Sequence, residues 1–103
     1  MPVFARDEVQ KGGDSTVGKI TAYSDGLIQI RKGGVDYSFV REKNDDFYSD
    51  FISYRERPIM GGRVDVNCRV LFIDNYYVIF KTSDTNKIQV PRYRVYAIVL
   101  NAN

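Results

Sequence analysis

Apolar and polar residues alternate along much of this chain, which is the period of a half-buried β-strand. In the stretch VGKITAYS, Ile20 and Ala22 fall on one side of an extended chain, and Lys19 and Tyr23 fall on the other. The same period recurs in LIQIRK, VDYSFVRE and RVDVNCRVLFI. Dipeptides typical of tight turns separate such stretches: Asp25-Gly26, Gly33-Gly34 and Asp74-Asn75. The pattern predicts antiparallel strands joined by hairpins, beginning near Val17.

Length and composition predict one folded unit. The chain has 103 residues, of which 44% are hydrophobic and 27% are charged, values that are ordinary for a globular domain. Charge, Gly and Ser dominate residues 1–16, where we expect a flexible N-terminal arm. We expect a single β-barrel domain over residues 17–101.

One segment changes period. Three aromatic residues have the helical spacing i, i+4, i+7: Phe47, Phe51 and Tyr54. Asn44 or Asp45 can cap the start of a helix, and Pro58 stops it. We therefore expect a short helix at about residues 45–55, with its aromatic stripe in the core.

The expected order is three meandering strands, a short helix and further antiparallel strands, as in an oligonucleotide/oligosaccharide-binding barrel. A small SH3-like or Tudor-like barrel is the competing fold, and the helix favours the former. Two stretches, SDGLIQIRKGGVDYSFVR and IDNYYVIFKTSDTNKIQVPR, share the order strand, turn, strand, turn, strand, Arg. They are either a diverged duplication or simply two similar meanders.

The stretch GKITAYSDGLIQIRKGGVDYSFVRE resembles the opening half of a cold-shock domain. Gly18-Lys19-Ile20 matches the start of that family's first strand, Tyr23 falls near its exposed aromatic position, and Phe39-Val40-Arg41 falls near its third-strand motif. GGRVDVNCRVLF is similar to the fourth strand. Leu27 stands where the family has an aromatic residue. The resemblance implies a barrel that stacks single-stranded bases on outward aromatics and follows the phosphates with Lys and Arg.

This resemblance leads to a predicted nucleic-acid-binding face. If Ile20, Ile28 and Val40 point inward, the opposite face collects aromatic, polar and cationic side chains: Lys19, Tyr23, Gln29, Arg31, Tyr37, Phe39 and Arg41. Arg92 and Arg94 alternate in the same way in the last strand and extend the predicted face. The expected ligand is single-stranded RNA, with DNA as the less favoured form. If Phe39 instead faces the core, the face loses its centre.

A protein-interaction module is the alternative function. The same barrel would then act as a scaffold or homodimer through a Tyr-rich surface or an exposed edge strand. The chain has a net charge of only +2 and contains eight tyrosines, and the aromatic residue of the second-strand motif is missing at Leu27. These features suit a protein partner as well as a nucleic acid.

Catalysis is not expected. The chain has no histidine, which removes Ser-His and Cys-His nucleophiles and His-based metal sites. Phosphate-binding glycine motifs are missing, so we predict no catalytic residue, metal, cofactor or small-molecule substrate. The single cysteine, Cys68, predicts a reducing compartment, either cytoplasm or nucleus. No apolar run reaches the 18 or so residues of a membrane span, so no membrane partner is expected.

Overall fold

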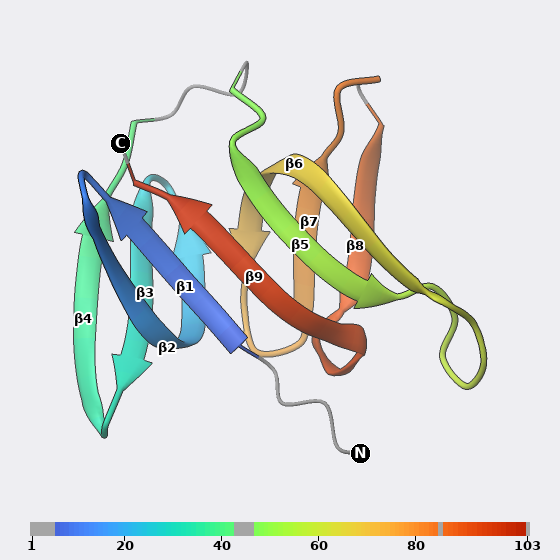
Figure 1. The fold of residues 1–103 in the computed structure, drawn as a ribbon, viewed down its shortest axis with the longest axis horizontal. Coiled ribbons are helices and arrows are strands. Elements are labelled where there is room, and N and C mark those ends of the chain that lie inside the picture. Colours follow the sequence, from blue (N-terminus) through green and yellow to red (C-terminus); the bar gives the residue numbers. More distant parts are fainter. Residues whose placement is uncertain (1–5, 43–46, 85, 103) are drawn as a thin grey trace.

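The alternating stretches form one curved sheet of nine strands. The computed structural model describes residues 6–42, 47–84 and 86–102. In chain order, the elements are β1 (Arg6–Lys11), β2 (Asp14–Ser24), β3 (Leu27–Lys32), β4 (Val35–Val40), β5 (Asp50–Arg55), β6 (Arg63–Ile73), β7 (Tyr77–Lys81), β8 (Lys87–Pro91), the 3-10 turn η1 (Arg92–Arg94) and β9 (Val95–Asn101). Their order in the sheet is β4-β3-β2-β1-β9-β5-β6-β7-β8 (Figure 1). The sheet is mixed, because β1 and β9 pair in parallel.

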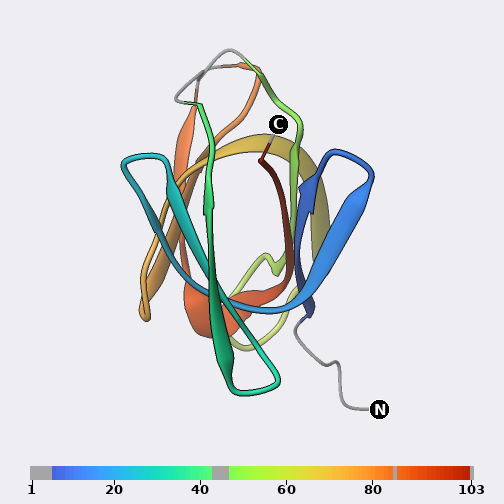
Figure 2. The same ribbon diagram turned by 90° about the vertical axis from the view of Figure 1, so that its left-hand side faces the viewer.

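A further pairing curls the sheet. Tyr23 near the end of β2 pairs with Ile73 at the end of β6, so β2, β1, β9, β5 and β6 form a partial ring (Figure 2). The β3–β4 and β7–β8 strand pairs extend the sheet beyond this ring. Large side chains inside the curve are fully buried: Phe80, Ile20, Ile28, Ile30, Ile52, Ile73, Ile98 and Leu100. The predicted β class is confirmed, but the sheet forms only a partial ring of five strands in place of the expected barrel.

The predicted meander of three strands is confirmed as β2, β3 and β4. Ile28 and Ile30 of β3 are fully buried, whereas Gln29 between them is exposed. The turn after β2 places Asp25 at φ +49° and Gly26 at φ +78°. This is the left-handed backbone that a tight hairpin turn requires, and it explains why an Asp-Gly pair stands there.

The helix expected over residues 45–55 is wrong where the structure describes that range. Residues 45 and 46 lie outside the described residues, and β5 occupies the second half of the range as a strand between β9 and β6. Ile52 is buried, and Tyr54 packs its ring against Phe80 at 5.7 Å between centroids. Phe47 is 61% exposed and is not a core residue. Pairing on both sides of β5 overrode a helical spacing carried by only three aromatic residues.

The flexible arm expected over residues 1–16 is wrong for residues 6–16. These residues form β1 and the start of β2, and β1 pairs with β2 on one side and β9 on the other. Residues 1–5 lie outside the described residues. Val9 supplies a buried apolar side chain of β1, and Asp7 on the same strand is 2% exposed. A short strand with a buried carboxylate gives little alternating signal in the sequence.

The first four strands and the next four are built alike. β2 and β6 each have 11 residues and a register shift, at Ile20/Ala22 and at Val70/Phe72. Each pairs with the strand before it and with the strand after it, and a further strand follows. The two similar sequence stretches therefore occupy equivalent places in the sheet.

Gly18 marks a close approach between β2 and β3. A Cβ atom at this position would lie 2.2 Å from the carbonyl oxygen of Arg31, whereas a Cβ at Gly13 would meet nothing within 4 Å. We therefore expect Gly18→Ala to lower the free energy of unfolding by about 1 to 3 kcal/mol through overpacking. Gly13→Ala, the matched control, should change it by less than about 0.5 kcal/mol. Urea unfolding followed by circular dichroism measures both, and equal midpoints for the two variants would contradict the close approach.

Candidate functional site

The predicted binding face fails at its centre because the register of β4 is opposite to the one expected. Phe39 pairs with Ile28, and Val40 pairs with Leu27. Directly paired residues of an antiparallel ladder lie on the same face, so Phe39 shares the core face of Ile28. Phe39 packs against the core, whereas Val40 is 70% exposed. The expectation that Val40 points inward is wrong.

Two more residues of the predicted face are buried. Tyr23 is 4% exposed and Arg41 is 3% exposed. The register shift after Ile20 adds a residue to β2, so Tyr23 turns to the core side although simple alternation from Ile20 places it outside. The guanidinium carbon of Arg41 lies 4.5 Å from the centre of the Tyr23 ring. Neither side chain is available to stack on a base.

The remaining strand residues of the predicted set are divided between the two faces. Tyr37 pairs with Ile30 and is 44% exposed at the open margin of the core face. Lys19 and Arg31 pair with each other on the outer face. Arg31 forms an exposed ion pair with Asp36 at 2.9 Å, and the hydrogen bond and charge of Asp36 raise the pKa of Arg31. Of the aromatic and cationic strand residues, only two cations lie together as predicted.

Arg92 and Arg94 lie in η1, before the last strand. Arg94 donates hydrogen bonds to the backbone carbonyls of Arg55 at 3.1 Å and Glu56 at 3.0 Å. These bonds fasten η1 to the end of β5. Arg92 forms an ion pair with Asp7, a buried carboxylate on β1. The two arginines therefore do not extend a common face.

The buried Arg41 belongs to a saturated polar cluster, which we call the closed clasp. Arg41 forms an ion pair with Asp50 at 2.8 Å, and both side chains are fully buried. Arg41 also donates to the carbonyl of Val70 at 2.6 Å and to the Tyr23 hydroxyl at 2.9 Å. Asp50 accepts the backbone N–H groups of Val70 at 2.8 Å and Asn101 at 3.0 Å. The Asn101 carbonyl accepts from Arg41 Nη1 at 3.3 Å.

The pKa values of Arg41 and of the neighbouring Cys68 are both shifted in the closed clasp. Burial disfavours the charged form of Arg41, but the hydrogen bond and charge of Asp50 outweigh this and raise the pKa of Arg41 above its ordinary value. Burial, with the nearby charge of Asp50, raises the pKa of the Cys68 thiol to about 12. The thiol is thus neutral near pH 7, and a buried neutral thiol behaves as a small apolar side chain.

A second cluster repeats this construction with Asp7 of β1, Ile20 of β2 and Arg92 of η1, and we call it the open clasp. Asp7 accepts the backbone N–H of Ile20 at 2.8 Å, as Asp50 does for Val70. Arg92 forms an ion pair with Asp7 at 2.5 Å and donates to the carbonyl of Ile20 at 2.9 Å. In each clasp, therefore, a carboxylate and a guanidinium bind the N–H and C=O of one residue beside a register shift.

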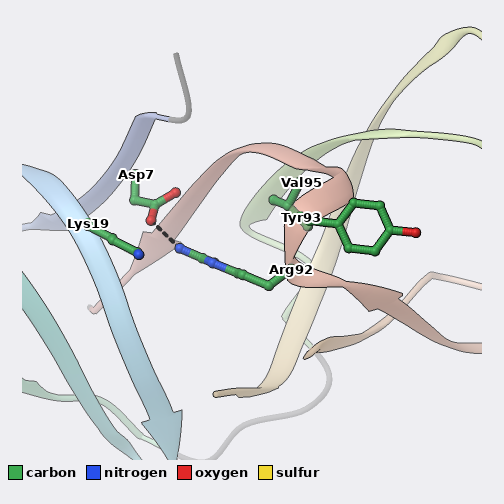
Figure 3. A pocket seen from close by; sticks show the side chains of 5 residues that line it. All are labelled: Asp7, Lys19, Arg92, Tyr93 and Val95. Atoms are coloured by element: carbon green, nitrogen blue, oxygen red, sulfur yellow. Dashed lines mark hydrogen bonds and ion pairs between the residues drawn. The ribbon is translucent and has the colours of Figure 1, made fainter. Parts of the chain in front are cut away.

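The open clasp lacks the partners that complete the closed one. Asp7 Oδ1 and Arg92 Nη1 are buried and have no hydrogen-bond partner among the residues that the structure describes. They border a pocket of about 350 Å³ whose lining is shown in Figure 3: Asp7, Lys19, Arg92, Tyr93 and Val95. Lys19 directs its amine toward the ion pair, and the Tyr93 ring projects away from it (Figure 3). This pocket is the candidate functional site.

Sequence reasoning found two residues of this site, Lys19 and Arg92, but for a different surface. Asp7 was assigned to the flexible arm, and Tyr93 was not singled out. A usable signal existed: each of the two similar stretches ends in an arginine, Arg41 and Arg92. Nothing in the sequence linked either arginine to its carboxylate, because the two carboxylates lie on strands that were not predicted.

Comparison with known proteins gives no relative. No protein-family model, curated protein or solved structure matches the chain. Within the described part of the chain, no three His, Cys, Asp or Glu side chains are placed to hold a metal ion. The same residues contain no helix of the length and apolarity needed to cross a membrane. Function must therefore be argued from the geometry of this chain.

Asp50 is the residue whose removal tests the closed clasp. We expect Asp50→Asn to lower the free energy of unfolding by about 3 to 5 kcal/mol, because it leaves the buried Arg41 charge without its counter-ion. Asp65→Asn is the matched control: Asp65 also pairs with an arginine, Arg63, at 2.9 Å, but in an exposed position. The control should unfold near the wild-type urea concentration. An Asp50→Asn midpoint equal to that of the control would show that the cluster does not stabilise the fold.

Proposed function

We propose that this chain is a non-catalytic protein-interaction module whose copies associate through the edge strand β4. The observation that carries the proposal is the contrast between the two edges of the sheet. β4 forms one edge and β8 forms the other. On β4, Val35 is 52% exposed, Tyr37 44% and Val40 70%. An exposed edge of this kind is a template for another strand unless something blocks it.

The hydrogen bonds of β4 show which backbone groups are left at its open edge. Arg41 donates its backbone N–H to the carbonyl of Gly26 at 2.9 Å, which marks a bonded pair just after β4. Bonded and non-bonded pairs alternate along an antiparallel ladder. Every second residue before Arg41 therefore also directs its backbone N–H and C=O groups toward β3. The residues between direct their N–H and C=O groups away from β3: Asp36, Ser38 and Val40.

The other edge has the blocking features that β4 lacks. Arg92 donates its backbone N–H to Tyr76 at 2.7 Å, as Arg41 does to Gly26, so Pro91 is the counterpart of Val40. Pro91 has no N–H to offer at this outward position, and Lys87 begins β8 with a charge. Proline and lysine are the residues that protect natural sheet edges. β4 contains neither.

A second copy of β4 fits this edge in antiparallel register about Ser38. Asp36 then lies opposite the partner's Val40, and Ser38 lies opposite the partner's Ser38. The outward N–H and C=O groups of these residues face those of the other copy and can form hydrogen bonds with them. Tyr37 lies opposite the partner's Phe39 on the core face, an aromatic cross-strand pair. Asp36 is already neutralised by Arg31, so no unpaired like charges meet. This self-complementary register favours a homodimer over a scaffold for an unrelated strand.

Ser38→Pro tests the dimer. It removes an N–H from the middle of the open edge but leaves the bonds to β3 in place, so the fold should persist. We expect the wild-type chain to be a dimer by light scattering at micromolar concentrations, and Ser38→Pro to be a monomer.

Ser38→Ala is the matched control, because it changes the same side chain and keeps the N–H. It should remain a dimer. Circular dichroism checks that all three proteins are folded. A monomeric wild-type chain, or a Ser38→Pro variant that still dimerises, would refute the dimer.

Single-stranded nucleic acid is a second candidate ligand, and one observation favours it. Tyr76 and Tyr93 are 71% and 69% exposed, and the backbone bond from Arg92 to Tyr76 holds their segments together. Lys19 and Tyr93 line the same pocket. Exposed aromatic rings beside a cation are the elements of a stacking surface. This surface differs from the one predicted from the sequence.

Fluorescence anisotropy with labelled 12-residue oligouridine and oligothymidine tests this second candidate. If it is correct, the affinity falls steeply between 50 and 200 mM salt, because bound phosphates release counter-ions. Tyr93→Ala should weaken binding by about 1 to 3 kcal/mol through lost stacking, and Tyr37→Ala, on the distant β4, should not. No binding at 50 mM salt would exclude this ligand class.

A further inference from the structure

The closed clasp shows which chemistry the open clasp is missing. In the closed clasp, the residue that completes the cluster is Asn101, at the end of β9. Its backbone N–H donates to Asp50 Oδ1, and its carbonyl accepts from Arg41 Nη1. A single extended residue thus bridges the carboxylate and the guanidinium, because the N–H and C=O of such a residue point to the same side.

The corresponding atoms of the open clasp are the two without partners. Asp7 Oδ1 needs a donor, and Arg92 Nη1 needs an acceptor. The Asp7 side chain is 3% exposed, and that of Arg92 is 14% exposed. Buried polar groups are nearly always hydrogen-bonded in folded proteins. The pair is therefore arranged to receive an N–H and an oxygen carried close together on one ligand.

Lys19 adds a positive charge to the pocket, and a neutral peptide group would not need it. Its counterpart in the other half is Arg69, which sits opposite Lys81 as Lys19 sits opposite Arg31. Arg69 donates to the backbone carbonyl of Glu42 at 2.7 Å. Lys19 has no hydrogen-bond or ion-pair partner among the described residues. With Asp7, Arg92 and Lys19 ionised, the open clasp carries one net positive charge, which favours an acceptor that is an anion.

The dimensions of the pocket favour a chain end. Its volume of about 350 Å³ is at the lower end of the range for ligand sites, roughly 300 to 1,000 Å³. Val95, which is 7% exposed, supplies an apolar wall. Such a space accepts one apolar side chain with its backbone groups.

From these contacts we infer that the open clasp binds the C-terminal residue of a peptide. The backbone N–H of that residue donates to Asp7 Oδ1, its carboxylate accepts from Arg92 Nη1 and Lys19 Nζ, and its side chain lies against Val95. Capture of a terminal carboxylate by convergent donors is a known mode of peptide recognition. The site is separate from the β4 edge, since Lys19 lies on β2 and β3 runs between these strands. It therefore adds a second type of protein partner to the proposed dimer.

Three probes of equal length test the chemistry of the site. They are acetyl-Gly-Gly-Leu as the free acid, the same peptide with a C-terminal amide, and an analogue in which an ester oxygen replaces the last backbone N–H. Amide NMR titration of the full chain should show saturable shifts near Ile20, Tyr93 and Val95 with the free acid. The dissociation constants of the other two probes should be at least tenfold larger, because one lacks the anion and the other lacks the donor.

Matched lysine variants test the residue that sets the preference. Lys19→Gln should bring the affinity of the free acid close to that of the amide. Lys87→Gln removes the same charge at the far end of β8 and should leave the preference unchanged. Circular dichroism controls for folding. Free leucine, whose ammonium group replaces the acylated N–H, distinguishes a small amino acid from a peptide end and should bind more weakly than the acylated probe.

The outcomes separate this inference from the proposed dimer. Ser38→Pro alters the β4 edge only, so it should bind the free acid as the wild type does, whether or not the wild type dimerises. Equal affinities for acid and amide, or an acid affinity unchanged by Lys19→Gln, would overturn the site. No shifts with the free acid at millimolar concentration would do the same. Binding of oligouridine that Lys19→Gln abolishes, without peptide binding, would assign the pocket to nucleic acid instead.

Discussion

The ion pair between Arg41 and Asp50 is the interaction on which the arrangement of the two halves depends. Burying two charges carries a large desolvation cost, which is recovered only where nearly every donor and acceptor finds a partner. Here the partners come from β2, β6 and the end of β9, and the two charged residues themselves connect β4 to β5. The cluster can be satisfied only when these segments meet in one way. It therefore specifies how the first repeat joins the second.

The functional surfaces are proposed where the two repeats differ. Each clasp holds the backbone beside a register shift with a carboxylate and an arginine, but only the closed clasp, built around Val70 of β6, is completed by β9. Both halves end in an edge strand, but only the second carries a proline at the outward position. In each comparison one copy is closed and the other is open. The closed copy therefore shows which backbone groups the open copy lacks.

Sequence periodicity predicted the elements that are half-buried and regular. β2, β3, β4 and β6 alternate and are bounded by turn residues, and they were found where expected. β1 was missed because it carries a buried carboxylate, Asp7, where alternation calls for an apolar residue, and β5 was missed because the spacing of its aromatic residues predicted a helix. The predicted face failed for a related reason. One extra residue in β2 reversed the side of Tyr23, and no local signal in the sequence marks that irregularity.

The same buried groups explain why the cationic and aromatic content of the chain gave a misleading prediction of the binding face. The sequence placed Arg41 and Tyr23 on one outward face, and in the structure the Arg41 guanidinium carbon does lie close to the Tyr23 ring, 4.5 Å from its centre. Their role in the fold is internal, because Asp50 lies within hydrogen-bond distance of the guanidinium. Arg92 differs from Arg41 in one respect that matters for ligands: part of its hydrogen-bonding capacity is unused. Arg69 Nε is also buried without a partner among the described residues, but Arg92 is the one of the two that borders the pocket, beside a carboxylate that also has an unused oxygen.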